Sequence, residues 1–195
     1  SFDSDPKKIN LTGDQQNAIS AICTSLDENI FDPFLLHGVT GSGKTEVFIE
    51  AAKHAMNQNK SVVVLLPEIS TTPQIAGRFK SVFGDSVAVW HSKLSKSSRA
   101  WIWKKICNGD FKIIVGARSA IFTPLKNLGL IIVDEEQENA YKQTSTSPKY
   151  HAKEVALMRG KISKATVILS SATPSIETYF NYKSNKFKYL ELPKR

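Results

Sequence analysis

The sequence predicts an α/β fold, a mainly parallel β-sheet with helices on both faces. Apolar runs such as residues 61–66, 112–116 and 129–134 are continuous rather than alternating, so both faces of each strand are expected to be buried. Helical segments separate these runs, and a polar cluster follows each run directly. Because ligands of parallel sheets collect at the carboxyl ends of the strands, one edge of the sheet is expected to carry the chemistry.

Local signals set the boundaries of the predicted elements. Pro67 stops a β-branched run, Pro73 suits the first turn of the helix after it, and Asn108-Gly109 ends a later helix. From residue 11 onward the predicted order is helix 13–26, strand 34–37, helix 44–57, strand 61–66, helix 71–82, strand 87–90, helix 95–107, strand 112–116, strand 129–134, helix 150–160 and strand 165–170.

Residues 38–45 match the phosphate-binding loop pattern G-x-x-x-x-G-K-[ST] at every fixed position. Glycines let the backbone turn its N–H groups toward phosphates, and the helix that begins here presents its positive end to the same anion. Lys44 is expected to reach the β- and γ-phosphates, and Thr45 to ligate Mg²⁺. The alternative is a plain turn before a helix, which the flanking strand and helix disfavour. The predicted ATP-binding loop is Gly38, Val39, Thr40, Gly41, Ser42, Gly43, Lys44 and Thr45.

Two carboxylates, Asp134 and Glu135, end the apolar run 129–134. An acidic pair after a strand is otherwise an ordinary surface turn. Beside a phosphate-binding loop, Asp134 is expected to hold Mg²⁺ and Glu135 to polarise the attacking water. Lys44, Asp134 and Glu135 are therefore the predicted catalytic residues of a nucleoside-triphosphate hydrolase.

Composition favours a single globular domain, and its basic charge is typical of a polyanion binder, although a general surplus of charge for solubility would also explain it. The 195 residues are 41% hydrophobic and carry a formal net charge of +8. No run reaches the ~18 apolar residues of a membrane span, no secretory signal is visible, and Cys23 and Cys107 are expected to be reduced. In the segment 141–161, cations outnumber acids five to one: Lys142, Lys149, Lys153, Arg159 and Lys161 against Glu154. Two tyrosines, Tyr141 and Tyr150, flank the loop within this segment.

Several strings of the chain resemble the first RecA-like motor domain of superfamily 2 helicases, and among them the bacterial replication-restart helicases of the PriA (primosomal protein N′) family. The resemblance covers nearly all of residues 11–195. The phosphate-binding loop is generic, whereas the strings at 67–74 and 116–124 are much narrower. The matching strings lie at residues 38–46, 66–74, 91–95, 116–124, 127–136, 141–143, 150–152 and 170–175.

The resemblance implies further residues around the nucleotide. Gln15 resembles the glutamine that reads the adenine edge, although a plain capped helix start would also explain Leu11-Thr12 with Gln15. Asp134, Glu135, Glu136 and Gln137 form the acidic box, in which the family usually has histidine at position 137. Glutamine only hydrogen-bonds, so charge-based coupling through that position is in question. The motif implied to couple the γ-phosphate to domain movement is Ser171, Ala172 and Thr173.

The same resemblance implies contacts with DNA. Residues 67–74 and 116–124 are expected to line a single-strand track, with Arg118 on a phosphate and Ser119 beside it; an internal ion pair is the other explanation for Arg118. Residues 137–152 resemble a loop that senses DNA. Lys142 is a candidate phosphate contact, and Tyr141 and Tyr150 are either base stackers or loop anchors. The four histidines are expected to be structural.

The resemblance also implies what lies outside this chain. A second lobe with arginine fingers, a zinc module and a domain that binds the 3′ end are expected elsewhere, so residues 11–195 are expected to be an ATP-binding lobe with little activity alone. Expected ligands are ATP, Mg²⁺ and single-stranded or forked DNA. Primosome and single-strand-binding proteins are expected partners, in the bacterial cytoplasm at the nucleoid. Alternatives are another superfamily 2 translocase or a non-motor nucleotide switch. Residues 1–10, the tip at 144–147 and the C-terminus from about residue 183 are expected to be flexible.

Overall fold

The computed structural model describes residues 10–67, 72–145 and 147–193. Within them, seven strands form one parallel sheet in the order β3-β4-β2-β5-β8-β1-β9. The strands of this sheet are β1 (Asp32–Gly38), β2 (Ser61–Leu65), β3 (Val87–Trp90), β4 (Ile113–Gly116), β5 (Leu128–Val133), β8 (Thr166–Ser171) and β9 (Lys188–Leu192).

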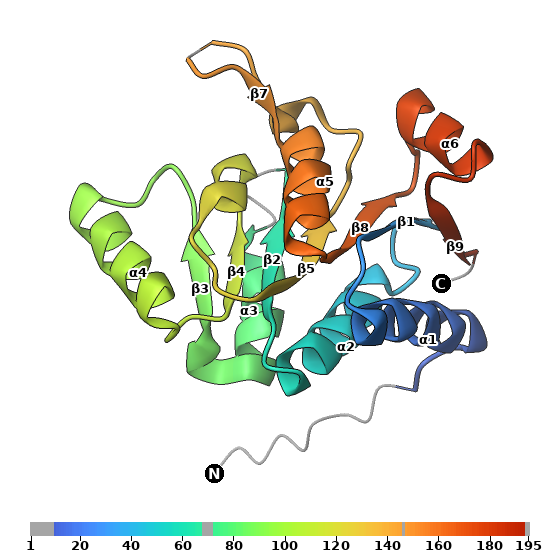
Figure 1. The fold of residues 1–195 in the computed structure, drawn as a ribbon, viewed down its shortest axis with the longest axis horizontal. Helices are drawn as coiled ribbons and strands as arrows, with labels where there is room; N and C mark the ends of the chain where they lie inside the picture. Colours follow the sequence, from blue (N-terminus) through green and yellow to red (C-terminus); the bar gives the residue numbers. More distant parts are fainter. Residues whose placement is uncertain (1–9, 68–71, 146, 194–195) are drawn as a thin grey trace.

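Helices cover both faces of the sheet, as the continuous apolar strands predict (Figure 1). One face holds α1 (Gly13–Glu28), α2 (Lys44–Asn57) and α3 (Thr72–Phe83). The other face holds α4 (Lys96–Asn108) and α5 (Ala152–Ser163). Short 3₁₀ turns are η1 (Gly84–Ser86), η2 (Arg118–Phe122) and η3 (Asn139–Tyr141), and α6 (Ile176–Lys183) follows β8.

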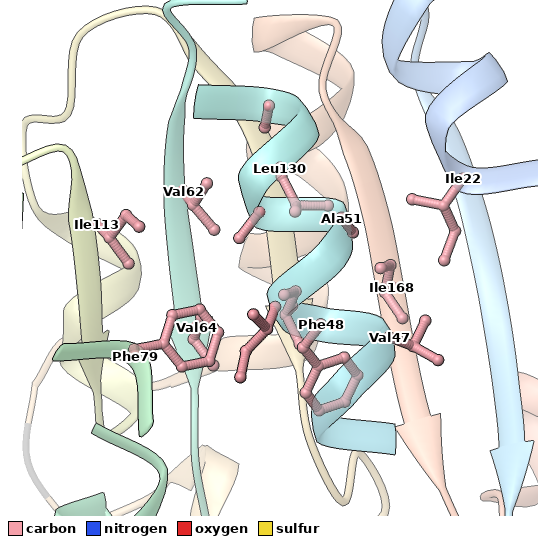
Figure 2. Close-up of a cluster of buried hydrophobic side chains, with 14 of the residues drawn as sticks. Ile22, Val47, Phe48, Ala51, Val62, Val64, Phe79, Ile113, Leu130 and Ile168 are labelled. Atoms are coloured by element: carbon pink, nitrogen blue, oxygen red, sulfur yellow. The ribbon is translucent and has the colours of Figure 1, made fainter. Parts of the chain in front are cut away.

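Alternate residues of the central strands supply the two cores. Val62 and Val64 of β2 point into the core under α1–α3, while Val63 and Leu65 point into the core under α4 and α5. Figure 2 shows the first core, in which Val47, Phe48 and Ala51 of α2 lie over Val64, Leu130 and Ile168 of the sheet. Burial on both faces fixes the register of each strand and therefore the position of the loop after it.

The expectation of a flexible C-terminus from about residue 183 is wrong for the described residues. The segment 188–192 forms β9, which pairs in parallel with β1 and buries Leu192 beside Gly38. A short antiparallel hairpin, β6 (Lys142–Gln143) with β7 (Tyr150–His151), was also not anticipated. The expected flexible segment at 1–10 lies outside the described residues except for Asn10, as do residues 68–71 of the string at 67–74 and Thr146 of the tip at 144–147.

Candidate nucleotide-binding site

The loop between β1 and α2 has a backbone path that depends on its glycines. Gly41 and Gly43 have φ of 81° and 83°, the left-handed region that side chains rarely adopt. A Cβ on Gly38 would lie 2.6 Å from Ser42 Oγ, and one on Gly43 would lie 2.0 Å from Gln15 Nε2. These contacts explain why glycine occupies positions 38 and 43.

The same loop has the features of an anion cradle. No side chain caps the N-terminus of α2, so its positive end faces the loop. Ser42 Oγ is buried and has no hydrogen-bond partner within the described residues. A cavity of about 560 Å³ opens here, lined by Asn10, Thr12, Gln15, Thr40, Gly41, Ser42, Gly43, Lys44, Thr45, Glu46, Arg78, Asp134 and Glu135. An uncapped helix start, an unpaired hydroxyl and this volume fit the phosphates of a nucleotide.

Lys44 joins the loop to the acidic box. The Lys44 side chain is buried, and its Nζ donates to Gly38 O at 3.2 Å and to Glu135 Oε1 at 3.0 Å. The parallel alignment of β1 and β5, with β8 between them, brings these two loops to the same edge of the sheet. The predicted neighbourhood of Lys44, Asp134 and Glu135 is therefore present in the structure.

Two hydrogen bonds hold the carboxylate of Asp134, which lines the cavity. Its Oδ1 accepts from Ser170 Oγ at 3.0 Å and from the Glu135 backbone N–H at 3.1 Å. Burial raises the pKa of this carboxyl, and the charge of Lys44 opposes that shift. A buried carboxylate that is costly to ionise gains from a nearby divalent cation. Within the described residues no cluster of three or more His, Cys, Asp or Glu could hold a metal by itself. A Mg²⁺ ion shared with phosphates needs fewer protein ligands.

A chain of hydrogen bonds runs from Glu135 to the predicted coupling residues. Gln137 Nε2 donates to Glu135 Oε2 at 3.1 Å, and Gln137 Oε1 accepts from Ser171 Oγ at 2.6 Å. Ser171 Oγ in turn accepts from the Thr173 backbone N–H at 2.9 Å. His37, which precedes the loop on β1, contacts Ala172 O through Nε2 at 3.2 Å. Because an amide both donates and accepts, Gln137 can link a carboxylate to a hydroxyl without carrying charge.

Gln15 has the contacts of a helix cap and of a loop clamp. It forms a capping box with Thr12, and its Nε2 donates to Gly43 O at 3.2 Å. The capped helix start is thus confirmed, while contact with adenine stays a prediction. Sequence reasoning missed an ion pair that also lines the cavity, Arg78 to Glu46 at 2.5 Å. No sequence motif includes Arg78. It reaches the cavity because α3, which carries it, packs beside α2 on the same face of the sheet.

The predicted DNA contacts divide into exposed and buried groups. Ser119 and Lys142 are exposed, and Tyr150 is half-buried, edge-on to Phe122 with centroids 5.0 Å apart. Arg118 donates to Ala140 O and Lys142 O, at 3.3 and 2.8 Å, so it braces the hairpin; these carbonyls take the place of the internal ion pair considered for it.

The prediction that Tyr141 contacts DNA is wrong. Its side chain is fully buried, with the hydroxyl on Leu65 O and Asp134 O, at 3.0 and 2.5 Å. A ring without exposed surface cannot stack on a base, so Tyr141 is a loop anchor.

None of the helices in the described parts of the chain is long and apolar enough to cross a membrane.

A family model described as DEAD/DEAH box helicase matches residues 12–181. Among curated relatives, the Replication restart protein PriA of Chlamydia pneumoniae is 49% identical over 190 residues, and that of Bacillus subtilis is 46% identical over 185 residues. These alignments cover 97% and 95% of this chain but 25% and 23% of the relatives. The chain thus spans about a quarter of the length of these relatives.

Solved structures have the same fold. RecG bound to a three-way DNA junction matches with a TM-score of 0.69 at 22% identity, over 96% of this chain and 24% of that one. The helicase MrfA bound to DNA matches with a TM-score of 0.69 at 15% identity, over 97% and 28%. The predicted RecA-like α/β fold is therefore confirmed.

Proposed function

This chain belongs to the DEAD/DEAH box helicase family, and on that basis we propose that it is the ATP-binding lobe of an ATP-dependent DNA helicase. The similarity to Replication restart protein PriA supports a role in replication restart and primosome assembly. In this proposal the complete protein couples ATP hydrolysis to 3′-to-5′ movement on single-stranded DNA. It works with primosome and single-strand-binding proteins on chromosomal DNA in the bacterial cytoplasm.

The observation that carries the proposal is the contact between Lys44 and Glu135, 3.0 Å apart at the mouth of the cradle. When the γ-phosphate binds, it offers Lys44 a stronger anionic partner, and Glu135 is released. Free of the lysine, Glu135 can accept a proton from the attacking water. Asp134 and Thr45 would hold Mg²⁺, which neutralises phosphate charge when it is bound. The 97% of the chain that aligns with PriA includes all four residues.

The hydrogen bonds of Gln137 suggest how a change of partner at Glu135 is transmitted to the segment 171–173. Once Glu135 changes partner, the Gln137 amide loses its acceptor, and the bond from Ser171 to Gln137 must adjust. Ser171 also holds the Thr173 backbone N–H, so the segment 171–173 would shift with the state of the γ-phosphate. The chain's own residues thereby connect hydrolysis to a neighbouring lobe.

DNA is proposed to cross the carboxyl edge of the sheet. Ser119, Lys142 and Tyr150 are accessible there, and Arg118 fixes the hairpin that presents two of them. RecG and MrfA, which share this fold, were each solved bound to DNA. Lysine and tyrosine suit backbone neutralisation and base stacking, which need no particular sequence.

The test is the ATPase rate of the full-length protein with and without single-stranded DNA. Glu135→Gln should lower kcat by roughly 100-fold or more while nucleotide affinity is retained. Lys44→Ala should lower both kcat and nucleotide affinity.

Helicase substrates with a 3′ or a 5′ tail test the direction of movement, and RNA oligomers test which nucleic acid is bound. Full ATPase activity in Glu135→Gln would overturn the mechanism, and stimulation by RNA alone would overturn the DNA assignment. Residues 1–195 alone should hydrolyse ATP at least ~10³-fold more slowly than the full-length protein, because the arginine fingers are expected on a second lobe.

A further inference from the structure

Trp90 and Trp103 form an aromatic pair at the edge of the sheet. Trp90 is the last residue of β3 and Trp103 lies on α4, with ring centroids 5.9 Å apart and planes at 49°. Trp90 Nε1 donates to Ser119 Oγ at 3.2 Å. This bond fixes the indole at η2, beside the carboxyl ends of β3 and β4. Trp103 remains 42% exposed, so one aromatic surface faces solvent next to the proposed DNA residues.

The face of α4 that carries Trp103 is basic. Lys96, Arg99 and Trp103 follow one another at spacings of three and four residues, which places them on one side of the helix. Arg99 donates to Ser92 O at 2.6 Å and so ties this side of the helix to the loop after β3. Lys93, Lys96 and Lys104 are exposed, and within the described residues no ion pair joins them to an acid. Lys105, by contrast, is paired with Asp110 at 2.9 Å.

An exposed indole among unpaired lysines suits a single-stranded nucleic acid. Bases stack on aromatic rings without regard to sequence, and the lysines offset phosphate charge. A stable protein interface buries about 1,000 Å² or more and is depleted of charged residues at its core, whereas this aromatic surface lies among lysines.

We propose that the Trp90–Trp103 pair is a base-stacking subsite that extends the single-strand track from η2 onto α4, with Lys93 and Lys96 beside the backbone. This inference rests on the proposed function, because it adds a contact for the same nucleic acid. Trp103 provides the stacking face. Trp90, which is held by its hydrogen bond to Ser119, positions the ring of Trp103.

The same helix provides a matched control. Trp101 is 56% exposed, more than Trp103, but it lies edge-on to Phe111 with centroids 5.6 Å apart. It lines a separate cavity together with Val87, Ala88 and Val89 of β3, and neither Trp90 nor Trp103 lines that cavity. Trp101 therefore faces a different surface from the Trp90–Trp103 pair. A general effect of losing an exposed tryptophan would appear equally at both positions.

The experiment measures the affinity of the full-length protein for a fluorescent oligo-dT by anisotropy. Trp103→Ala should weaken binding by roughly 10-fold, the loss expected for one stacked base. Trp103→Phe should restore most of the affinity, and Trp101→Ala should bind as the unaltered protein does. Lys96→Ala should reduce the salt slope by about one unit. Equal effects of the two alanine variants would overturn the proposal.

A second measurement does not depend on the folding of an alanine variant. Oligo-dT should quench the tryptophan fluorescence of the unaltered protein; Trp103→Phe should remove most of that quenching and Trp101→Phe should preserve it. Quenching that survives in Trp103→Phe would overturn the subsite. If the unaltered protein binds and hydrolyses normally while Trp103→Ala binds equally well, only the subsite fails. If the unaltered protein binds no single strand, the proposed function fails with it.

Discussion

Glu136 and Lys153 form a buried ion pair. Lys153 Nζ lies 2.9 Å from Glu136 Oε2, and the side chains are 8% and 0% exposed. Glu136 also accepts from the Ser175 backbone N–H at 2.7 Å and from Thr178 Oγ1 at 2.9 Å. One carboxylate thus connects the acidic box to the first turns of α5 and α6. It points away from the cavity that Asp134 and Glu135 line.

Removing one partner of this pair should be costly. Lys153→Met leaves Glu136 charged and buried, so the free energy of unfolding should fall by about 3–5 kcal/mol. Urea denaturation measures this. The double variant Glu136→Gln/Lys153→Met should recover part of the loss, since the amide can still accept from Ser175 and Thr178.

A surface pair serves as the control for this measurement. Lys53 and Glu50 lie 2.7 Å apart on α2, with side chains 45% and 36% exposed. Lys53→Met should change the free energy of unfolding by no more than about 0.5 kcal/mol. Similar losses in Lys53→Met and Lys153→Met would refute the assignment of a special role to burial.

Tyr141 and Tyr150 should separate stability from DNA binding. Tyr141→Phe removes the hydroxyl from Leu65 O and Asp134 O, which leaves buried carbonyls without that donor, and should cost about 1–3 kcal/mol. Its affinity for single-stranded DNA should be unchanged. Tyr150→Ala should weaken that affinity, because its half-buried ring keeps accessible surface on the hairpin that is proposed to contact DNA. Urea denaturation and anisotropy on both variants check this, and reduced DNA affinity in Tyr141→Phe at unchanged stability would be the contrary outcome.

The sequence was sufficient for the sheet and the cradle, because both depend on local signals. Continuous apolar runs identify β2, β4, β5 and β8, and the glycine spacing of residues 38–45 identifies the loop. The resemblance to replication-restart helicases is confirmed by 49% identity over 190 residues. Strand β9 was missed because Lys188 and Glu191 give it the composition of a charged tail. Its pairing with β1 is a long-range contact that no local pattern records.

The direction of the side chains in the acidic box could not be read from the sequence. Glu135 has φ of 47°, a left-handed conformation that is unusual for glutamate. This turn sends Asp134 and Glu135 toward the cradle and Glu136 into the protein. Tyr141 was ambiguous for a similar reason, since a tyrosine in a basic loop can be buried or exposed. Only the contact of its hydroxyl with the end of β2 decides.

Two helical glycines should respond in opposite ways to alanine. Gly77 of α3 is exposed, and an added Cβ would meet nothing within 4 Å, so Gly77→Ala should stabilise by about 0.5–1 kcal/mol. At Gly160 of α5 a Cβ would lie 2.4 Å from Val167 Cγ2 on β8. Gly160→Ala should therefore destabilise by about 1–3 kcal/mol. Thermal or urea unfolding of both variants distinguishes the two effects; stabilisation by Gly160→Ala would mean that α5 can move off the sheet.

His151 should make stability depend on pH on the acidic side of neutrality. Its Nδ1 accepts from the Lys153 backbone N–H at 3.3 Å and so caps α5, which requires an unprotonated nitrogen. Burial lowers the pKa of His151 below 6.5, and Lys153 and Lys142 act in the same direction, while Glu154 and Glu136 oppose them. Below pH 6.5 the unfolded chain therefore binds more protons than the folded one. The contribution of the cap is complete above that pH and is lost as the pH falls through the lower, folded pKa.

His151→Asn tests this dependence, because asparagine caps helices well and does not titrate. At neutral pH the variant should match the unaltered protein to within about 1 kcal/mol. In acid the unaltered protein should lose stability faster, so the difference in the free energy of unfolding should move in favour of the variant. Urea denaturation across this range measures that difference. A constant difference at every pH would mean that His151 keeps the same protonation equilibrium in the folded and unfolded chains, and that the cap at α5 does not depend on it.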